Sequence, residues 1–279
     1  MRSRWKTGAG FVGAVAAAMA AVLVPLPPAH AADCPDAEVV FARGTTEDPG
    51  PGPNGQAFIN ALRAHVGPKS VGTYAVDYPA TTDFPTAVIG ISDARAHIVA
   101  TAASCPNTKM VLGGFSQGAA VMGFVTADVV PEGVSPLDVP APMPTEVADH
   151  IAAVALFGKP SPRFMRAISD PQITIGSLYT AKTIDLCVDN DLVCDPHGSS
   201  FSVHNQYDDS GMIDQGATFA ADQLQAAWVR DAAAAAAPSS APPLDAPAAH
   251  LPPTGTAGPV GPPSPLAPAS LPEHLPPLT

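Results

Sequence analysis

Apolar stretches and mixed polar stretches alternate along most of the chain. Five apolar runs have the length of buried strands, at residues 38–43, 70–78, 108–115, 151–158 and 181–186. Four longer stretches predict helices, at residues 56–65, 86–103, 117–128 and 212–237. Because strands that alternate with helices need crossover connections, this pattern predicts a mainly parallel sheet in one α/β domain. Several prolines in residues 131–144 predict a surface excursion.

The first 31 residues do not continue this pattern. Three basic residues precede an apolar run of about fourteen residues, and an Ala-His-Ala tripeptide ends the segment. That order is typical of a secretory signal peptide with a cleavage site at its end. An uncleaved membrane anchor is the alternative, but the run is short for a membrane span. We therefore expect a signal peptide over residues 1–31 and a secreted domain over residues 32–237, with no integral membrane span in the mature chain.

Residues 238–279 consist largely of alanine and proline with few aromatic residues. Such a segment cannot bury enough apolar surface to offset its chain entropy, so we expect a disordered or polyproline-like tail. Residues 251–255 read Leu-Pro-Pro-Thr-Gly, which matches the signal of sortase-anchored wall proteins. That signal also requires an apolar span and a basic end, and neither follows. A spacer or adhesive tail that associates with the cell envelope is the better interpretation.

Composition and charge limit the partners. The chain has 279 residues, of which 46% are hydrophobic, and this is enough for the core of one sizeable domain. The formal net charge of −12 becomes −15 when Arg2, Arg4 and Lys6 leave with the predicted leader. So acidic a chain argues against nucleic acid and against anionic membrane surfaces as partners, and it suits a soluble exported protein. We expect a monomer.

All four cysteines, Cys34, Cys105, Cys187 and Cys194, follow the predicted leader. An even number of cysteines in an exported chain favours two disulfides. Three pairings are possible, and the one that joins Cys187 to Cys194 across a short loop leaves Cys34 with Cys105. A zinc site is the alternative, but the long gaps between the first three cysteines oppose it, so we expect no metal.

Ser116 carries the clearest chemical signal. It lies in Gly-Phe-Ser-Gln-Gly at residues 114–118, between an apolar strand and an alanine-rich helix. A G-x-S-x-G elbow needs small neighbouring residues because the turn is tight, and it places the serine at a helix N-terminus, where backbone N–H groups can stabilise an oxyanion. Glycine and serine are common, so the pattern alone is weak. The strand before it and the helix after it favour a nucleophilic serine.

A serine nucleophile needs an imidazole to take its proton and a carboxylate to orient that imidazole. Of the eight histidines, only His197 and His204 follow the last predicted strand at a plausible position. Four carboxylates compete for the second role: Asp185, Asp189, Asp191 and Asp195. Spacing does not choose among them, although a short disulfide loop would hold Asp191 more firmly than its neighbours.

Taken jointly, these motifs are specific to one family. The chain resembles the cutinases, especially the cutinase-like esterases of actinobacteria, over about residues 33–230. The resemblance rests on Ala-Arg-Gly-Thr-Thr-Glu at residues 42–47, the serine elbow, a Cys-x3-Asp-x2-Cys loop at residues 187–194, and a histidine ten residues after its second cysteine. It implies an α/β-hydrolase-like three-layer sandwich, with a central, mainly parallel five-stranded sheet flanked by helices.

The resemblance also implies the site and the reaction. It makes Ser116 the nucleophile, Asp191 the orienting acid and His204 the base, with an oxyanion hole at Gln117 and Thr45. It implies hydrolysis of carboxylic esters of lipids or polyesters through an acyl-enzyme, without any cofactor. It pairs the cysteines in the same way as the loop argument.

The substrate is less defined. Apolar residues near the implied triad are candidates for an acyl groove, although a packing role suits each equally: Phe84, Leu192, Val193, Phe201 and Val203. The tail and Lys159-Pro160 depart from the fungal cutinases and leave the natural substrate open. Two other functions remain, an acyltransferase that uses the same residues and a non-catalytic surface protein that binds a partner through its tail and acidic face.

Overall fold

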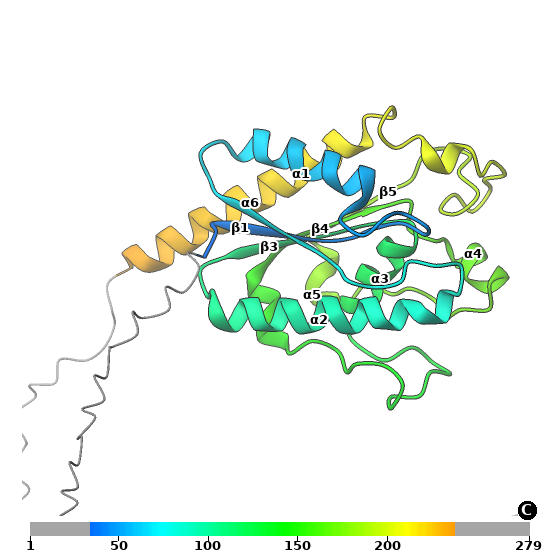
Figure 1. Cartoon of the computed structure of the whole chain (residues 1–279). Coiled ribbons are helices and arrows are strands. Elements are labelled where there is room, and N and C mark those ends of the chain that lie inside the picture. The colour runs from blue at the N-terminus through cyan, green and yellow to red at the C-terminus, as the bar shows by residue number, and fades with distance from the viewer. Residues whose placement is uncertain (1–33, 238–279) are drawn as a thin grey trace, which may run out of the picture. The chain divides into compact units, whose positions relative to one another are not determined.

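The computed structural model describes residues 34–237 (Figure 1). The predicted signal peptide and the predicted tail lie outside the described residues, so both stay predictions. Within residues 34–237, no helix is both long enough and apolar enough to cross a membrane.

A five-stranded sheet in the order β2-β1-β3-β4-β5 forms the centre of the domain. Its strands are β1 (Ala37–Ala42), β2 (Val71–Ala75), β3 (Lys109–Phe115), β4 (Ile151–Phe157) and β5 (Thr183–Leu186). Every neighbouring pair is parallel, which confirms the predicted sheet and makes it wholly rather than mainly parallel. All residues of β3 and β4 are buried, and this explains their continuous apolar sequences.

Four long helices connect and cover the strands: α1 (Gly52–Val66), α2 (Ala87–Ser104), α3 (Gln117–Val125) and α6 (Met212–Ala236). The sequence predicted all four to within a few residues. Five short helical segments were not predicted: η1 (Phe84–Thr86), η2 (Thr145–His150), α4 (Pro162–Ala167), α5 (Ser177–Thr180) and η3 (Val203–Asn205). Each has six residues or fewer, which is too short to show a helical period.

The helices cover the two faces of the sheet in pairs, with α1 and α6 on one face and α2 and α3 on the other (Figure 1). Alternate residues of β1 point to opposite faces. Val39 and Phe41 pack in the core with α1 and α6, whereas Val40 and Ala42 pack in the core with α2 and α3. The three layers are those of an α/β-hydrolase-like fold.

Parallel strands end at one edge of the sheet, and the predicted functional residues follow those ends. Residues 43–47 follow β1, Ser116 follows β3, and residues 187–204 follow β5. In open parallel sheets, this carboxyl edge is where ligands bind. The topology therefore brings together residues that are far apart in sequence.

Two disulfides close the fold. Cys34–Cys105 joins the chain just before β1 to the residue after α2, and Cys187–Cys194 closes the loop after β5. All four cysteines are paired as the sequence argument and the family resemblance indicated.

Candidate active site

Ser116 lies at a sharp turn between β3 and α3. Its φ of 55° and ψ of −118° are unusual for a residue with a side chain, as in a nucleophile elbow. Its backbone N–H donates to the carbonyl of Phe157 at 2.9 Å, which ties the turn to β4. A Cβ atom at Gly118 would collide with the carbonyl of Ala42, and one at Gly114 with the carbonyl of Gly118. The two motif glycines are therefore required by close backbone packing.

Ser116, His204 and Asp191 form one hydrogen-bonded chain. His204 Nε2 lies 2.7 Å from Ser116 Oγ, and His204 Nδ1 lies 2.7 Å from Asp191 Oδ2. Asp191 is 0% exposed and His204 is 3% exposed. Because an ionised carboxylate only accepts hydrogen bonds, Nδ1 donates to Asp191 and Nε2 is left to accept from the serine hydroxyl. This geometry suits activation of the serine by a general base.

The competing residues lie elsewhere. His197 is exposed, and so is Asp189. The carboxylate of Asp185 pairs with Lys159 at 3.2 Å, and that of Asp195 accepts the backbone N–H of His197 at 2.8 Å. Sequence spacing left two histidines and four aspartates open. The structure brings His204 and Asp191 to Ser116, and these are the two that the family resemblance implied.

The Asp191 carboxylate accepts hydrogen bonds on both oxygens. Val193 N–H donates to Oδ1 at 2.8 Å, and the Tyr207 hydroxyl donates to Oδ2 at 2.9 Å. Burial opposes ionisation of Asp191, but the hydrogen bonds from His204, Val193 and Tyr207 outweigh it and hold the pKa of the carboxyl below its usual range. Asp191 is therefore an anion at neutral pH and accepts the hydrogen bond from His204 Nδ1.

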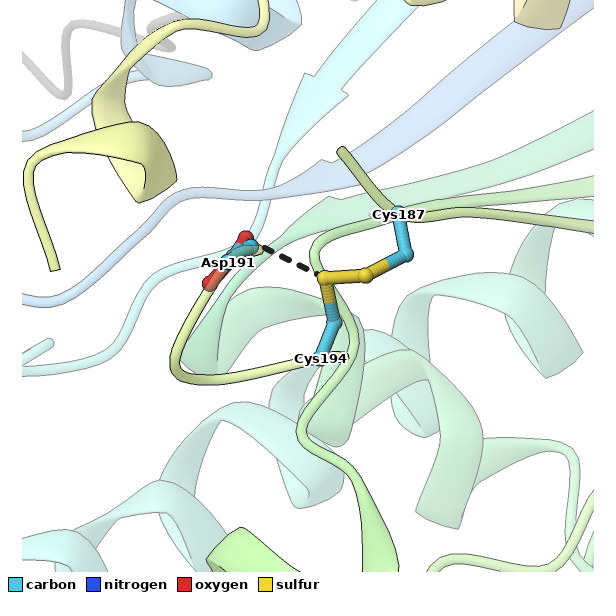
Figure 2. Close-up of side chains that lie close together, drawn as sticks. All are labelled: Cys187, Asp191 and Cys194. Carbon is cyan, nitrogen blue, oxygen red and sulfur yellow. Dashed lines mark hydrogen bonds between the residues drawn. A yellow bond between two sulfur atoms is a disulfide. The ribbon is translucent and has the colours of Figure 1, made fainter. Parts of the chain in front are cut away.

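The short disulfide lies against this acid. Figure 2 shows the sulfur of Cys194 beside the Asp191 side chain, 3.1 Å from Oδ2. Cys187, Asp191 and Cys194 lie close enough to suggest a metal site, with candidate ligand atoms within 4.8 Å of one another. Both sulfurs, however, belong to the disulfide and are not thiolates. The cluster is better explained as a cross-link that holds the Asp191 loop.

Thr45 and Gln117 line a cavity together with Ser116. The backbone N–H of Gln117 belongs to the first turn of α3, where N–H groups have no partner within the helix. The Gln117 side chain donates to the carbonyl of Thr81 at 3.0 Å and so connects the elbow to the segment before α2. Both residues that the resemblance implies as oxyanion donors therefore line the same cavity as the serine.

Arg43 organises the loop that carries Thr45. Arg43 is only 4% exposed, and its guanidinium donates to the carbonyls of Glu47 at 2.9 Å and Val76 at 3.3 Å. It also donates to the carbonyl of Tyr78 at 2.5 Å, so that the loop after β1 is fastened to the chain after β2. Sequence reasoning gave Arg43 no role, although its place in the 42–47 motif was visible.

Glu47 closes the same loop from the other side. Its Oε2 accepts the backbone N–H of Gly44 at 2.7 Å. Burial raises the pKa of Glu47, and the Gly44 N–H and the Arg43 charge only partly oppose that rise. Sequence reasoning missed this carboxyl too, because nothing in the local pattern showed that the loop folds back on itself.

A cavity of about 750 Å³ opens at Ser116 and His204. Most of its lining is apolar. Of the five groove candidates, Phe84, Val193 and Phe201 line it, whereas Leu192 and Val203 do not.

The predicted surface excursion forms part of the cavity wall. Contributors from residues 131–144 are Pro131, Val134, Val139, Pro140, Ala141 and Pro142, and Val129 and Val130 just before this segment also line the cavity. Sequence reasoning missed this role because the segment has no helix or strand, and its scattered apolar residues therefore show no period.

A wholly parallel sheet, with a serine at the β3–α3 elbow and a histidine and a buried carboxylate at the same edge, defines an α/β-hydrolase-like protein. Comparison with known proteins specifies the family. The chain belongs to the cutinase family, whose sequence profile matches residues 33–224, and it is a carboxylic ester hydrolase.

Similar proteins occur in mycobacteria. The chain is 60% identical over 174 residues to the probable carboxylesterase Culp5 of Mycobacterium tuberculosis. This alignment covers 62% of this chain and 99% of Culp5. The chain is also 46% identical over 230 residues to the phospholipase Culp4 of the same organism. This alignment covers 79% of this chain and 96% of Culp4.

Solved structures agree with the fold. A cutinase of Trichoderma reesei, in complex with a phosphonate inhibitor, superposes with a TM-score of 0.52 at 28% identity over 68% of this chain and 77% of that chain. An acetylxylan esterase superposes with a TM-score of 0.55 at 21% identity over 68% of this chain and 99% of that chain, and this match bears on the fold alone.

Proposed function

We propose that this protein is an exported serine esterase that hydrolyses carboxylic esters of lipids with a triad of Ser116, His204 and Asp191. The observation that carries the proposal is the unbroken hydrogen-bonded chain through the three side chains, with both distances at 2.7 Å. Ser116 and His204 line a largely apolar cavity.

The reaction begins with the serine. His204 takes the proton of Ser116 as the serine oxygen attacks the ester carbonyl, and Asp191 stabilises the resulting imidazolium. The carbonyl oxygen becomes an oxyanion that accepts hydrogen bonds from the Gln117 N–H and from Thr45. The C–O bond to the alcohol then breaks, and His204 donates its proton to the leaving oxygen.

Hydrolysis of the acyl-enzyme repeats these steps with water. His204 takes a proton from the water as its oxygen attacks the acyl carbon, and the bond to Ser116 breaks as the serine recovers that proton. The acid leaves and the resting site is restored. These steps use side chains and backbone N–H groups only.

The cavity supports an acyl chain as the bound part of the substrate. Its volume of about 750 Å³ lies in the usual range for small-molecule sites, and most of its wall is apolar. Each buried methylene would contribute about 0.8 kcal/mol to binding, so esters of longer acids should bind better until the cavity is full. The phospholipase and carboxylesterase names of the relatives are consistent with a lipid substrate.

Export is supported by the composition of residues 1–31 and by the two disulfides, which persist in oxidising compartments. Fractionation of the natural host into medium, envelope and cytoplasm tests this part of the proposal. The mature N-terminus should begin near residue 32. A protein found only in the cytoplasm with an intact N-terminus would contradict export.

The decisive experiment replaces the nucleophile. Ser116→Ala should abolish hydrolysis of p-nitrophenyl esters and labelling by a fluorophosphonate, while circular dichroism and thermal unfolding stay unchanged. Ser92→Ala, on the outer part of α2, is the matched control and should keep both activities. Turnover by a folded Ser116→Ala protein would reject the triad. Formation of a new ester in the presence of an alcohol acceptor, without free acid, would favour acyl transfer over hydrolysis.

A further inference from the structure

Tyr207 contributes a buried hydroxyl to the acid side of the site, and the steps above do not use it. It lies three residues after His204 and is 0% exposed. Its hydroxyl donates to Asp191 Oδ2 at 2.9 Å, the same oxygen that accepts from His204 Nδ1 at 2.7 Å. Two donors therefore share one carboxylate oxygen.

The same phenol oxygen touches other parts of the acid loop. It lies 3.2 Å from the sulfur of Cys194, and it accepts the backbone N–H of Val188 at 3.3 Å. One atom thus contacts the carboxylate, the disulfide and the chain just after β5. This number of contacts exceeds what packing of an aromatic ring alone would require.

The surroundings hold the tyrosine ring in place. It packs edge-on against Phe115, with ring centroids 5.4 Å apart. Gly158, the residue after β4, leaves room for the hydroxyl, since a Cβ atom there would lie 2.9 Å from the hydroxyl oxygen and 2.8 Å from His204 Cε1. The position of the hydroxyl is therefore set from several directions.

We propose that Tyr207 is a positioning residue that acts through Asp191. Its hydrogen bond fixes the rotation of the carboxylate so that Oδ2 faces His204, and it disperses part of the negative charge on that oxygen. A carboxylate with less charge on Oδ2 favours protonated imidazole less strongly. Tyr207 thereby keeps His204 available as a neutral base. The inference rests on the proposed triad.

Burial, reinforced by the negative charge of Asp191, raises the pKa of Tyr207 well above its usual value. The hydroxyl therefore remains a donor throughout the pH range in which a histidine base works. Three other carboxylates interact electrostatically with residues around the site, without a hydrogen bond: Glu47 with His204, Asp208 with Glu47, and Asp185 with Tyr207. Tyr207 differs from them because it donates directly to Asp191.

The first test is Tyr207→Phe, which keeps the ring and removes the hydroxyl. Since a hydrogen bond to a charged group is involved, kcat should fall about tenfold to a hundredfold with KM unchanged. The acidic limb of the pH–rate profile should move to higher pH, because the more basic carboxylate favours protonated His204. Tyr179→Phe is the matched control, since Tyr179 is 4% exposed in the core on the other face of the sheet. It should change neither kcat nor the acidic limb.

A purely structural role predicts a different result. Tyr207→Phe would then lower the midpoint of thermal unfolding and leave kcat and the acidic limb in place, and that outcome overturns the inference. In an Asp191→Asn background, Tyr207→Phe should have little further effect on kcat, because its route passes through Asp191. An undiminished loss in that background also overturns it. Full activity of Asp191→Asn alone would instead reject the triad itself.

A second variant covers the case in which Tyr207→Phe does not fold. Incorporation of fluorotyrosine at position 207 keeps the shape of the side chain and makes the hydroxyl a stronger donor. The acidic limb should then move to lower pH, opposite to the shift in Tyr207→Phe. An unchanged limb in the folded fluorotyrosine protein overturns the inference.

Discussion

The proposed nucleophile is held by the sheet, whereas the proposed acid and base are held by loops. Ser116 directly follows β3 and bonds to β4 through its backbone, and its flanking glycines pack against main-chain atoms. Asp191 and His204 lie in the irregular chain between β5 and α6. There, a disulfide and side-chain hydrogen bonds replace the strand ladder. The region around Ser116 should therefore be most sensitive to added side-chain volume, whereas the loops that carry Asp191 and His204 should be most sensitive to the loss of a cross-link.

The largest effect is expected from volume at the elbow. Gly118→Ala would place a Cβ atom against the carbonyls of Ala42 and Arg43, which are main-chain atoms and cannot turn away. We expect destabilisation of about 3 kcal/mol or more, with no measurable esterase activity. Denaturant unfolding measures the destabilisation, and an esterase assay measures the activity.

Gly123→Ala is the matched control for Gly118→Ala, because Gly123 lies in the same helix and the nearest atoms that its Cβ would meet belong to the side chains of Ile173 and Ile175. Its destabilisation should be clearly smaller. Equal unfolding free energies for the two variants would contradict the claim that the elbow is limited by backbone packing.

The oxyanion donor should give the next largest effect. Thr45→Val removes the hydroxyl and keeps the branched shape, so kcat should fall about a hundredfold to a thousandfold with little change in stability. Thr45→Ser should retain most of the activity. Thr82→Val, at an exposed position in the same cavity lining, is the control and should stay near wild type. A fall of less than threefold in Thr45→Val would mean that the hydroxyl does not act in the reaction.

The two disulfides allow the loop that carries Asp191 to be compared with a cross-link elsewhere in the fold. Replacing Cys187 and Cys194 with alanine should lower kcat about tenfold by loosening the Asp191 loop, and should cost about 2.5 kcal/mol of stability by the loop-entropy estimate. Replacing Cys34 and Cys105 should cost more, about 4 kcal/mol, because the closed loop is longer, and should leave kcat unchanged. Steady-state kinetics at a temperature where all variants are folded checks this. Equal kcat in the two double variants would remove the functional distinction between the disulfides.

The smallest effect concerns acid stability. The pKa of Asp191 is lower in the folded chain than in the unfolded one, where it should be near 3.9. The ionised carboxyl therefore stabilises the fold above about pH 4, and this contribution is lost as pH falls through the lower folded value. The stability difference between wild type and Asp191→Asn should shrink over that acidic range. Chemical unfolding measures this difference, and a stability difference that does not vary with pH would contradict the lowered pKa of Asp191 in the folded chain.

The strands and long helices were predictable because each carries its own pattern. Continuous apolar runs identified β3 and β4, and the turn chemistry around Ser116 identified the elbow. The short helices were not predictable, since segments such as η3 contain less than two helical turns. The wall formed by residues 129–142 was missed for a similar reason, because its apolar residues follow no period.

The choice among acids and bases shows the limit of spacing. Asp185, Asp189, Asp191 and Asp195 are close in sequence, and only the folded loop turns one of them toward His204 while another pairs with Lys159. The family resemblance selected Asp191 and His204, and the structure brings these two to Ser116. Their catalytic roles stay predictions until the variants are measured.

The amino-acid sequence alone determined the fold class, the five strands, the four long helices and the strained serine elbow, because these depend on local periodicity and on residues adjacent in the chain. Only the tertiary structure decided which carboxylate faces His204, how Arg43 and Glu47 shape the Thr45 loop, and that Tyr207 shares the Asp191 oxygen. Those contacts join segments that no sequence period links. They arise where the parallel strands end together at one edge of the sheet.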